Sequence, residues 1–194
     1  MNSWPRGYAC VDFDGLSEGP YSLRPLEWAD RGPIRDWRNE QIEILRQSAA
    51  LTESDQDRYY EDIIRPQMGQ AQPAQVLAAF LDDGELIGYG GIVHIAWPHR
   101  RGEVSFITAT DRQDPAQFSA DLSAFLRLVA RLAARLDLHR LTTETYEFRS
   151  AFIAELERAG YVQEGRQRDH VWDGDRFIDS LIHGVLLPGS EIRG

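Results

Sequence analysis

The side chains that most often carry covalent or metal chemistry are scarce in this chain of 194 residues. Lysine is absent, which excludes a Schiff base and a catalytic lysine. Cys10 is the single cysteine, so no intrachain disulfide can form. His94 and His99 flank a proline turn without a cysteine or acidic partner at ligand spacing, so we expect no metal site. P-loop, dinucleotide-binding and nucleophile-elbow motifs are absent from the sequence.

Composition limits the class of partner. The net charge of −10 repels phosphate backbones, so nucleic acid is not expected, and it mildly favours a cationic or amine ligand. No apolar run reaches the roughly 18 residues of a membrane span, and residues 1–20 lack the apolar segment of a secretory leader. We therefore expect a cytoplasmic protein that binds neither nucleic acid nor a membrane.

The elements that must position any active side chain follow from periodicity and turn signals. A first strand is expected at 21–26. Apolar residues at helical spacing predict a helix over 34–47. A capping-box pattern that begins at Thr52 predicts a second helix, which Pro66 is expected to end.

The rest of the sequence alternates between strand-like and helix-like periods. Further strands are expected at 75–81, 85–95, 103–109, 141–146, 161–172 and 177–187, with a long helix at 118–136 and a short one at 151–159. Asp82-Asp83-Gly84 is a strong hairpin signal between the first two of these strands.

The order of elements predicts a single α/β domain of the α+β kind over 21–187. We expect a mixed, mostly antiparallel sheet of about seven strands flanked by about four helices. Residues 1–20 would form an irregular lead-in or arm, and residues 188–194 a C-terminal tail.

Five segments, in register over about residues 21–187, resemble the GNAT superfamily of N-acetyltransferases. They are most similar to the branch that contains the ribosomal-protein alanine N-acetyltransferases. The segments are Tyr21-Ser-Leu-Arg-Pro-Leu26, Asp36-Trp-Arg-Asn39, Ile87-Gly-Tyr-Gly-Gly91, Glu155-Leu-Glu-Arg-Ala-Gly-Tyr161 and the ending over 173–186.

The resemblance implies a transferase that moves an acetyl group from acetyl-CoA to a primary amine by direct attack. The acceptor would be a small molecule, an amino sugar or a peptide N-terminus, and we expect a monomer or homodimer. The strands at 103–109 and 141–146 would diverge, and the pantetheine arm of the cofactor would lie between them. The pyrophosphate would bind backbone N–H groups at the start of the long helix.

The resemblance places the proton acceptor for the attacking amine at Glu103, at the start of the fourth strand. A partly buried carboxylate with a raised pKa suits that role; the alternative is an exposed Glu103 that pairs with Arg100 or Arg101. Glu144 is the second candidate for the base. Tyr146 is a candidate acid for the leaving thiolate, although simple packing on the sheet explains it at least as well.

Cofactor contacts are implied at Phe106, Ile107, Thr108, Arg112, Phe118, Ser119, Ala120 and Arg149. The family's glycine-rich phosphate loop falls on 116–121, where Ser119 and Asp121 stand in place of both glycines. Asp114 followed by Pro115 is also a good helix N-cap, and a capping carboxylate competes with phosphate for the same N–H groups.

Three accounts of this region remain open. In the first, the long helix begins at Phe118 or Ser119, Arg112 supplies positive charge, and acetyl-CoA binds. In the second, the chain is a non-catalytic binding or regulatory domain with an altered phosphate loop. In the third, the fold uses another acyl donor or holds the cofactor differently.

Acceptor contacts are implied at Trp37, Arg38 and Asn39. Trp37 also fits the apolar face of its helix, so packing explains it equally well. Arg38 and Asn39 are polar residues beside that face, where they would line the acceptor cleft.

Overall fold

The computed structural model describes residues 3–45, 47 and 49–188. Its eight-stranded sheet has the order β1-β2-β3-β4-β5-β6-β8-β7. The strands are β1 (Ser17–Glu18), β2 (Tyr21–Pro25), β3 (Val76–Asp82), β4 (Glu85–Ala96), β5 (Arg101–Thr108), β6 (Arg140–Tyr146), β7 (Val162–Trp172) and β8 (Phe177–Leu186). All neighbouring strands are antiparallel except β5 and β6, which are parallel.

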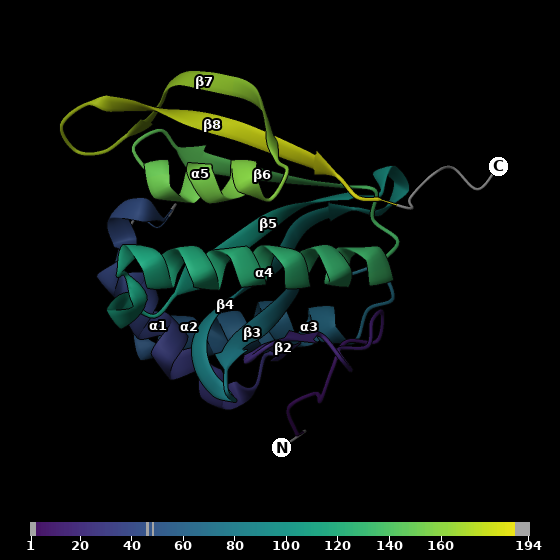
Figure 1. Cartoon of the computed structure of the whole chain (residues 1–194). Helices are drawn as coiled ribbons and strands as arrows, with labels where there is room; N and C mark the ends of the chain where they lie inside the picture. Colours follow the sequence, from purple (N-terminus) through teal and green to yellow (C-terminus); the bar gives the residue numbers. More distant parts are fainter. Residues whose placement is uncertain (1–2, 46, 48, 189–194) are drawn as a thin grey trace.

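Helices cover both faces of the sheet. The α-helices are α1 (Arg31–Glu40), α2 (Glu53–Arg58), α3 (Arg65–Met68), α4 (Pro115–Arg135) and α5 (Ser150–Arg158). Short 3₁₀ turns are η1 (Trp28–Asp30), η2 (Ile42–Ile44), η4 (Trp97–His99) and η5 (Thr110–Arg112), and η3 (Tyr59–Ile64) is a π-helical segment. Figure 1 shows α4 and α5 on one face of the sheet and α1, α2 and α3 on the other.

Alternation along the strands divides their side chains between these two layers. Phe106 of β5 packs on Phe125 of α4, with ring centroids 4.3 Å apart. On the opposite face, the Tyr89 hydroxyl of β4 accepts a hydrogen bond from Arg38 of α1 at 2.8 Å. Tyr89 pairs directly with Ile107, so Ile107 and every second residue of β5 from it face α1.

The strands and the second helix begin close to where the sequence predicts them. The Asp82-Asp83-Gly84 turn is a hairpin whose Asp83 and Gly84 both have positive φ, 48° and 87°. Thr52 caps α2 as expected: its hydroxyl accepts a hydrogen bond from Asp55 N at 3.1 Å. The sheet has one strand more than the seven or so expected, because Ser17–Glu18 of the lead-in pairs with β2.

Two helix boundaries differ from expectation. The helix predicted over 34–47 is α1, which ends at Glu40 and is followed by the separate turn η2; Arg46 lies outside the described residues. Pro66 does not end the second helix, which continues through η3 into α3. Pro66 lies in the first turn of α3, where the missing proline N–H is not needed.

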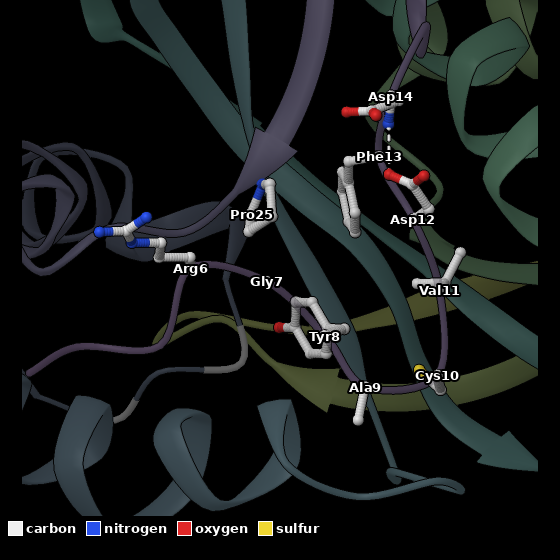
Figure 2. A pocket seen from close by; sticks show the side chains of 10 residues that line it. All are labelled: Arg6, Gly7, Tyr8, Ala9, Cys10, Val11, Asp12, Phe13, Asp14 and Pro25. Carbon is white, nitrogen blue, oxygen red and sulfur yellow. Dashed lines mark hydrogen bonds between the residues drawn. The ribbon is translucent and has the colours of Figure 1, made fainter.

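The N-terminal lead-in is irregular apart from β1, and it packs into the core. Tyr8, Phe13 and Leu16 are buried, and the Tyr8 hydroxyl accepts a hydrogen bond from Leu77 N at 3.0 Å. Residues 6–14 and Pro25 line a hollow of about 520 Å³, and Figure 2 shows how their side chains lie. Of the predicted tail 188–194, only Pro188 is described. Within the described ranges, no helix is both long and apolar enough to cross a membrane.

Candidate active site

The parallel strands β5 and β6 separate partway along their length. They pair only at Arg101–Arg140, Gly102–Leu141 and Glu103–Thr142, and no later pair joins them in the described structure. Beyond Glu103, each strand continues toward its carboxyl end without the other, and α4 starts after that end of β5. The sheet therefore has the divergence that the family resemblance implies, with Glu103 at its apex.

Glu103 projects from the apex onto the face that carries α1, because it lies an even number of residues from Ile107. Its carboxylate is 23% exposed, and Oε2 lies 3.0 Å from His94 Nδ1. Of the two arginines named as alternative partners, Arg100 and Arg101, Arg100 binds the Asp137 carboxylate at 2.6 Å. We call this face of the sheet the acceptor face, because it also carries α1, the helix of the predicted acceptor contacts Trp37, Arg38 and Asn39. A half-buried carboxylate there, hydrogen-bonded to an imidazole, suits transfer of a proton away from a bound amine.

His94 is a contact that sequence reasoning missed. The ladder between β4 and β5 shifts register between Val93 and Ala96, and His94 has φ 51°. This β-bulge turns the imidazole toward Glu103, one residue beyond the last regular pair, Val93–Glu103. The alternating pattern of the sequence does not reveal this shift of register. The presence of a histidine in the strand next to that of Glu103 was the signal from which the contact could have been predicted.

Glu144 and Tyr146 share the acceptor face with Glu103. Thr142 is the neighbour of Glu103, and side chains two and four residues along β6 project to the same side. Glu144 Oε1 lies 3.2 Å from His170 Nδ1, which also contacts Ser180 Oγ at 2.9 Å. Glu144 stands about 7 Å and Tyr146 about 13 Å along the strand from the apex. The structure thus brings all three candidate catalytic side chains to one face, with Glu103 nearest the closed end.

The three cofactor contacts expected on β5 are not equivalent. Ala109 N donates to Ile87 O of β4 at 2.8 Å, so alternation also directs the backbone of Ile107 toward β4. Phe106 and Thr108 direct their backbone groups to the other edge, which faces the divergence. Gln41 Nε2 donates to Thr108 O at 2.8 Å. The Phe106 backbone is therefore a group on β5 that faces the divergence, whereas the Ile107 backbone faces β4; cofactor contacts at these residues stay predictions.

The start of α4 also differs from the first account. The helix begins at Pro115, not at Phe118 or Ser119, and Asp114 is its N-cap. One oxygen of the Asp114 side chain accepts hydrogen bonds from Ala116 N and Gln117 N, each at 3.1 Å. Proline at the first position and a capping carboxylate are together a strong helix start, and they override the glycine-based loop of the family.

Arg112 does not offer the charge that was expected for phosphate. Its guanidinium binds Asp121 at 2.6 and 2.7 Å and Asp82 at 2.9 Å. Hydrogen bonding to Asp121 raises the pKa of Arg112. Asp121 is fully buried and also accepts from the Tyr21 hydroxyl at 2.9 Å and from Gln117 Nε2 at 2.8 Å. The residue that stands at a glycine position of the family is therefore the centre of a buried polar network.

The remaining positions at the start of α4 face α5. Phe118 and Phe152 have ring centroids 6.4 Å apart, and the Ser119 hydroxyl donates to the Glu155 carboxylate. Ala120 is exposed. A shallow hollow of about 380 Å³ lies between the two helices, lined in part by Phe118, Ser119 and Glu155.

Arg149 lies at the N-cap of α5. Its guanidinium carbon is 4.5 Å above the Phe152 ring, and burial lowers its pKa to about 10, so it remains protonated near neutral pH. Among the described residues, no carboxylate lies within ion-pair distance of it. Arg149 is therefore a positive charge at the start of α5 that no described carboxylate neutralises.

The acceptor-side residues organise a loop. Asn39 Oδ1 accepts from Leu51 N at 2.7 Å, and its Nδ2 donates to Leu51 O at 2.9 Å. Arg38 Nε donates to Gln47 Oε1 at 3.0 Å, in addition to its bond with Tyr89. Trp37 packs against the core, as its place on the apolar face of the helix predicts. Arg38 therefore holds Gln47, and Asn39 holds Leu51, both of which lie between η2 and α2.

A cavity of about 570 Å³ opens beside this loop on the acceptor face. Its lining joins η2 to the ends of β6, β7 and β8 and consists of Ile42, Glu43, Leu45, Gln47, Tyr146, Phe148, Val171, Trp172, Asp173, Asp175 and Ile178. The described lining holds three carboxylates, three aromatic rings and no basic side chain. Aromatic faces and carboxylates attract an ammonium group. Among the described residues, no cluster of side chains is arranged to bind a metal.

The residues present fit the pantetheine arm of coenzyme A better than its phosphates. The Phe106 backbone faces the divergence and has no strand partner there in the described structure, so it can hydrogen-bond an amide. The family's phosphate position, at the start of α4, is taken by Asp114. Arg149 supplies one positive charge nearby.

Comparison with known proteins agrees with this geometry. The model of the acetyltransferase (GNAT) domain matches residues 23–182. A spermidine N-acetyltransferase from Vibrio cholerae, solved with CoA and spermine, has a TM-score of 0.76 and 19% identity over 89% of this chain and 99% of its own. The ribosomal-protein-S5-alanine acetyltransferase from Vibrio fischeri has a TM-score of 0.70 and 14% identity over 91% and 98% of the two chains. A search of curated sequences gives no match. The family model spans most of the sequence, and the chain belongs to the GNAT acetyltransferase family.

Proposed function

We propose that this protein is an N-acetyltransferase that transfers an acetyl group from acetyl-CoA to a primary amine by direct attack. The observation that carries the proposal is the position of Glu103, at the apex of the divergence between β5 and β6 and on the face that carries α1. Acetyl-CoA supplies an activated acetyl thioester. The protein must then orient an amine and remove its proton.

Glu103 is the proton acceptor in this proposal. An ammonium group cannot attack until it loses a proton, and a carboxylate at the apex can accept it within hydrogen-bond reach. The amine nitrogen then bonds to the acyl carbon and the C–S bond breaks, and the second proton that the nitrogen loses balances the one that the leaving thiolate takes up. His94, 3.0 Å from the Glu103 carboxylate and largely exposed, gives the proton on Glu103 a path to solvent.

Glu144 and Tyr146 are assigned to the acceptor. Glu144 is held by His170, and Tyr146 lines the cavity beside η2. Three carboxylates and three aromatic rings in that cavity favour a cationic acceptor over a neutral or acidic one. The two solved relatives act on a polyamine and on a ribosomal protein, which agrees with an amine acceptor of either size. A cytoplasmic location and a monomeric or homodimeric state stay predictions from the sequence.

The test combines binding with turnover. Acetyl-CoA should raise the melting temperature, because a ligand that binds only the folded state stabilises it by mass action. Release of free thiol should then depend on added amine, measured over a panel of linear diamines, amino sugars and peptides with a free N-terminus. No thermal shift at millimolar acetyl-CoA, together with no amine-dependent thiol release, would favour the non-catalytic binding or regulatory domain instead.

A further inference from the structure

The first turn of α4 has no N–H group to spare for an anion. A helix start normally leaves its first four N–H groups without partners inside the helix. Pro115 has no N–H, Ala116 N and Gln117 N bind the Asp114 carboxylate, and Phe118 N binds Asp114 O at 2.8 Å. The bond of Phe118 N is the first hydrogen bond within the helix, so residues 115–117 are the positions of α4 that lack a helical partner, and the Asp114 carboxylate and the proline account for all three.

The charge at this helix start is also unfavourable to phosphate. The Asp114 carboxylate stands where an anion would bind the helix dipole. Asp111 adds a second carboxylate three residues earlier, in η5. Arg112, between them in sequence, has its guanidinium bound to Asp82 and Asp121. A diphosphate placed here would have to displace Asp114 and would meet like charge.

The region predicted for the pantetheine arm differs from this helix start, because a backbone group of β5 is unpaired by any strand there in the described structure. The Phe106 backbone faces the divergence of β5 and β6, and beyond Glu103 no pair of residues bridges the two strands in the described structure. Arg149 provides a single positive charge at the start of α5. One partly exposed ion pair strengthens binding by about fivefold or less.

We propose that Asp114 is a specificity-determining residue that keeps the start of α4 closed to the donor's diphosphate, so that the donor is held mainly through its pantetheine arm. Pantetheine thioesters that lack the nucleotide are then donors of similar quality to acetyl-CoA. This inference rests on the proposed function for its kinetic test, and a binding measurement tests it independently.

The kinetic experiment compares kcat/KM for acetyl-CoA and for S-acetylpantetheine in the whole protein with a saturating amine. The wild type should prefer acetyl-CoA by no more than about fivefold, the contribution of one ion pair. Asp114→Asn keeps a side chain that caps helices well, so the fold is retained while the charge is removed. It should raise kcat/KM for acetyl-CoA about two- to fivefold at low salt, less at high salt, and leave S-acetylpantetheine unchanged.

Asp111→Asn is the matched control, because it removes one charge nearby without touching the N–H groups of α4. It should change the acetyl-CoA value by less than Asp114→Asn does. A preference for acetyl-CoA of a thousandfold or more would overturn the inference, as would an Asp114→Asn variant with unchanged or weaker use of acetyl-CoA.

Calorimetric titration with CoA and with pantetheine separates this inference from the proposed function. Similar affinities for the two ligands, with CoA gaining from Asp114→Asn, support the inference even if no amine is ever acetylated. Tight binding of CoA with no detectable binding of pantetheine contradicts it, whatever the turnover.

Discussion

Carboxylates have opposite roles at the two ends of the divergence between β5 and β6. At the apex, the Glu103 carboxylate is 23% exposed and lies 3.0 Å from His94 Nδ1. At the start of α4, Asp114 is committed to the backbone of its own helix, and Asp121 is buried under three donors. The comparison teaches that a carboxylate is available for chemistry only where hydrogen bonds to its own fold do not already occupy it. The apex is arranged for proton transfer, and the helix start is arranged for stability.

The substitution Glu103→Gln tests most directly whether the carboxylate at the apex accepts the proton. The amide cannot accept a proton, so kcat should fall by about 10²–10⁴-fold while the dissociation constant for acetyl-CoA stays the same. Steady-state kinetics and a thermal-shift titration measure the two quantities. Glu144→Gln is the matched comparison and should lower kcat by less, since Glu144 lies farther along β6. Equal rates in Glu103→Gln and the wild type would remove Glu103 from the role.

The substitution Asp121→Ala tests whether the carboxylates near the start of α4 serve the stability of the fold. This change leaves the Arg112 guanidinium, the Tyr21 hydroxyl and the Gln117 amide without their common acceptor. Loss of one partner of a buried ion pair costs about 3–5 kcal/mol of unfolding free energy. Urea unfolding measures it, with Asp111→Ala as a control that should change stability by less than about 0.5 kcal/mol. A loss below 1 kcal/mol in Asp121→Ala would show that the network is not structural.

A smaller effect is expected for the loop that borders the acceptor cavity. Asn39→Ala removes the hydrogen bonds that hold Leu51 and Gln47, so the unfolding free energy should fall by about 1–3 kcal/mol. The KM for the amine should rise, while the KM for acetyl-CoA should not. A variant in which both KM values rise together would place Asn39 outside the acceptor side.

The smallest effect expected is a pH dependence from His183, a fully buried residue of β8. Burial lowers its pKa from 6.5, and the carboxylates of Glu157 and Glu164 partly oppose this. The unfolded chain therefore binds a proton at His183 more readily than the folded chain does. The free energy of unfolding should be unaffected by His183 above about pH 6.5 and should fall as the pH drops below that value. Melting temperatures between pH 8 and 5 should fall less steeply in His183→Phe than in the wild type; parallel curves would contradict this.

Local signals in the sequence were enough for most of the fold. The positive φ angles of Asp83 and Gly84, and the capping box at Thr52, depend on residues within four positions of each other. Pro66 misled because the π-helical segment before it shifts the hydrogen-bond register, and no residue type announces that shift.

Long-range contacts determine what the sequence left open at the site. In the sequence, Asp121 appears only as a residue that replaces a family glycine. Its role depends on the fold, which brings Tyr21 to it from 100 residues away and brings Asp82 to its partner Arg112 from 30 residues away. His94 joins Glu103 only because a bulge turns it. The choice between Phe106 and Ile107 requires the strand register, since a shift of one residue exchanges the two edges.

Residue-resolved amide hydrogen exchange, measured with and without acetyl-CoA, tests the central contrast most directly. If the donor lies along β5 and the start of α4 stays closed, the Phe106 amide should exchange more slowly when acetyl-CoA is bound. The amides of Ala116 and Gln117, already bound to Asp114, should keep their rates. Slower exchange at Ala116 and Gln117 with no change at Phe106 would contradict the account.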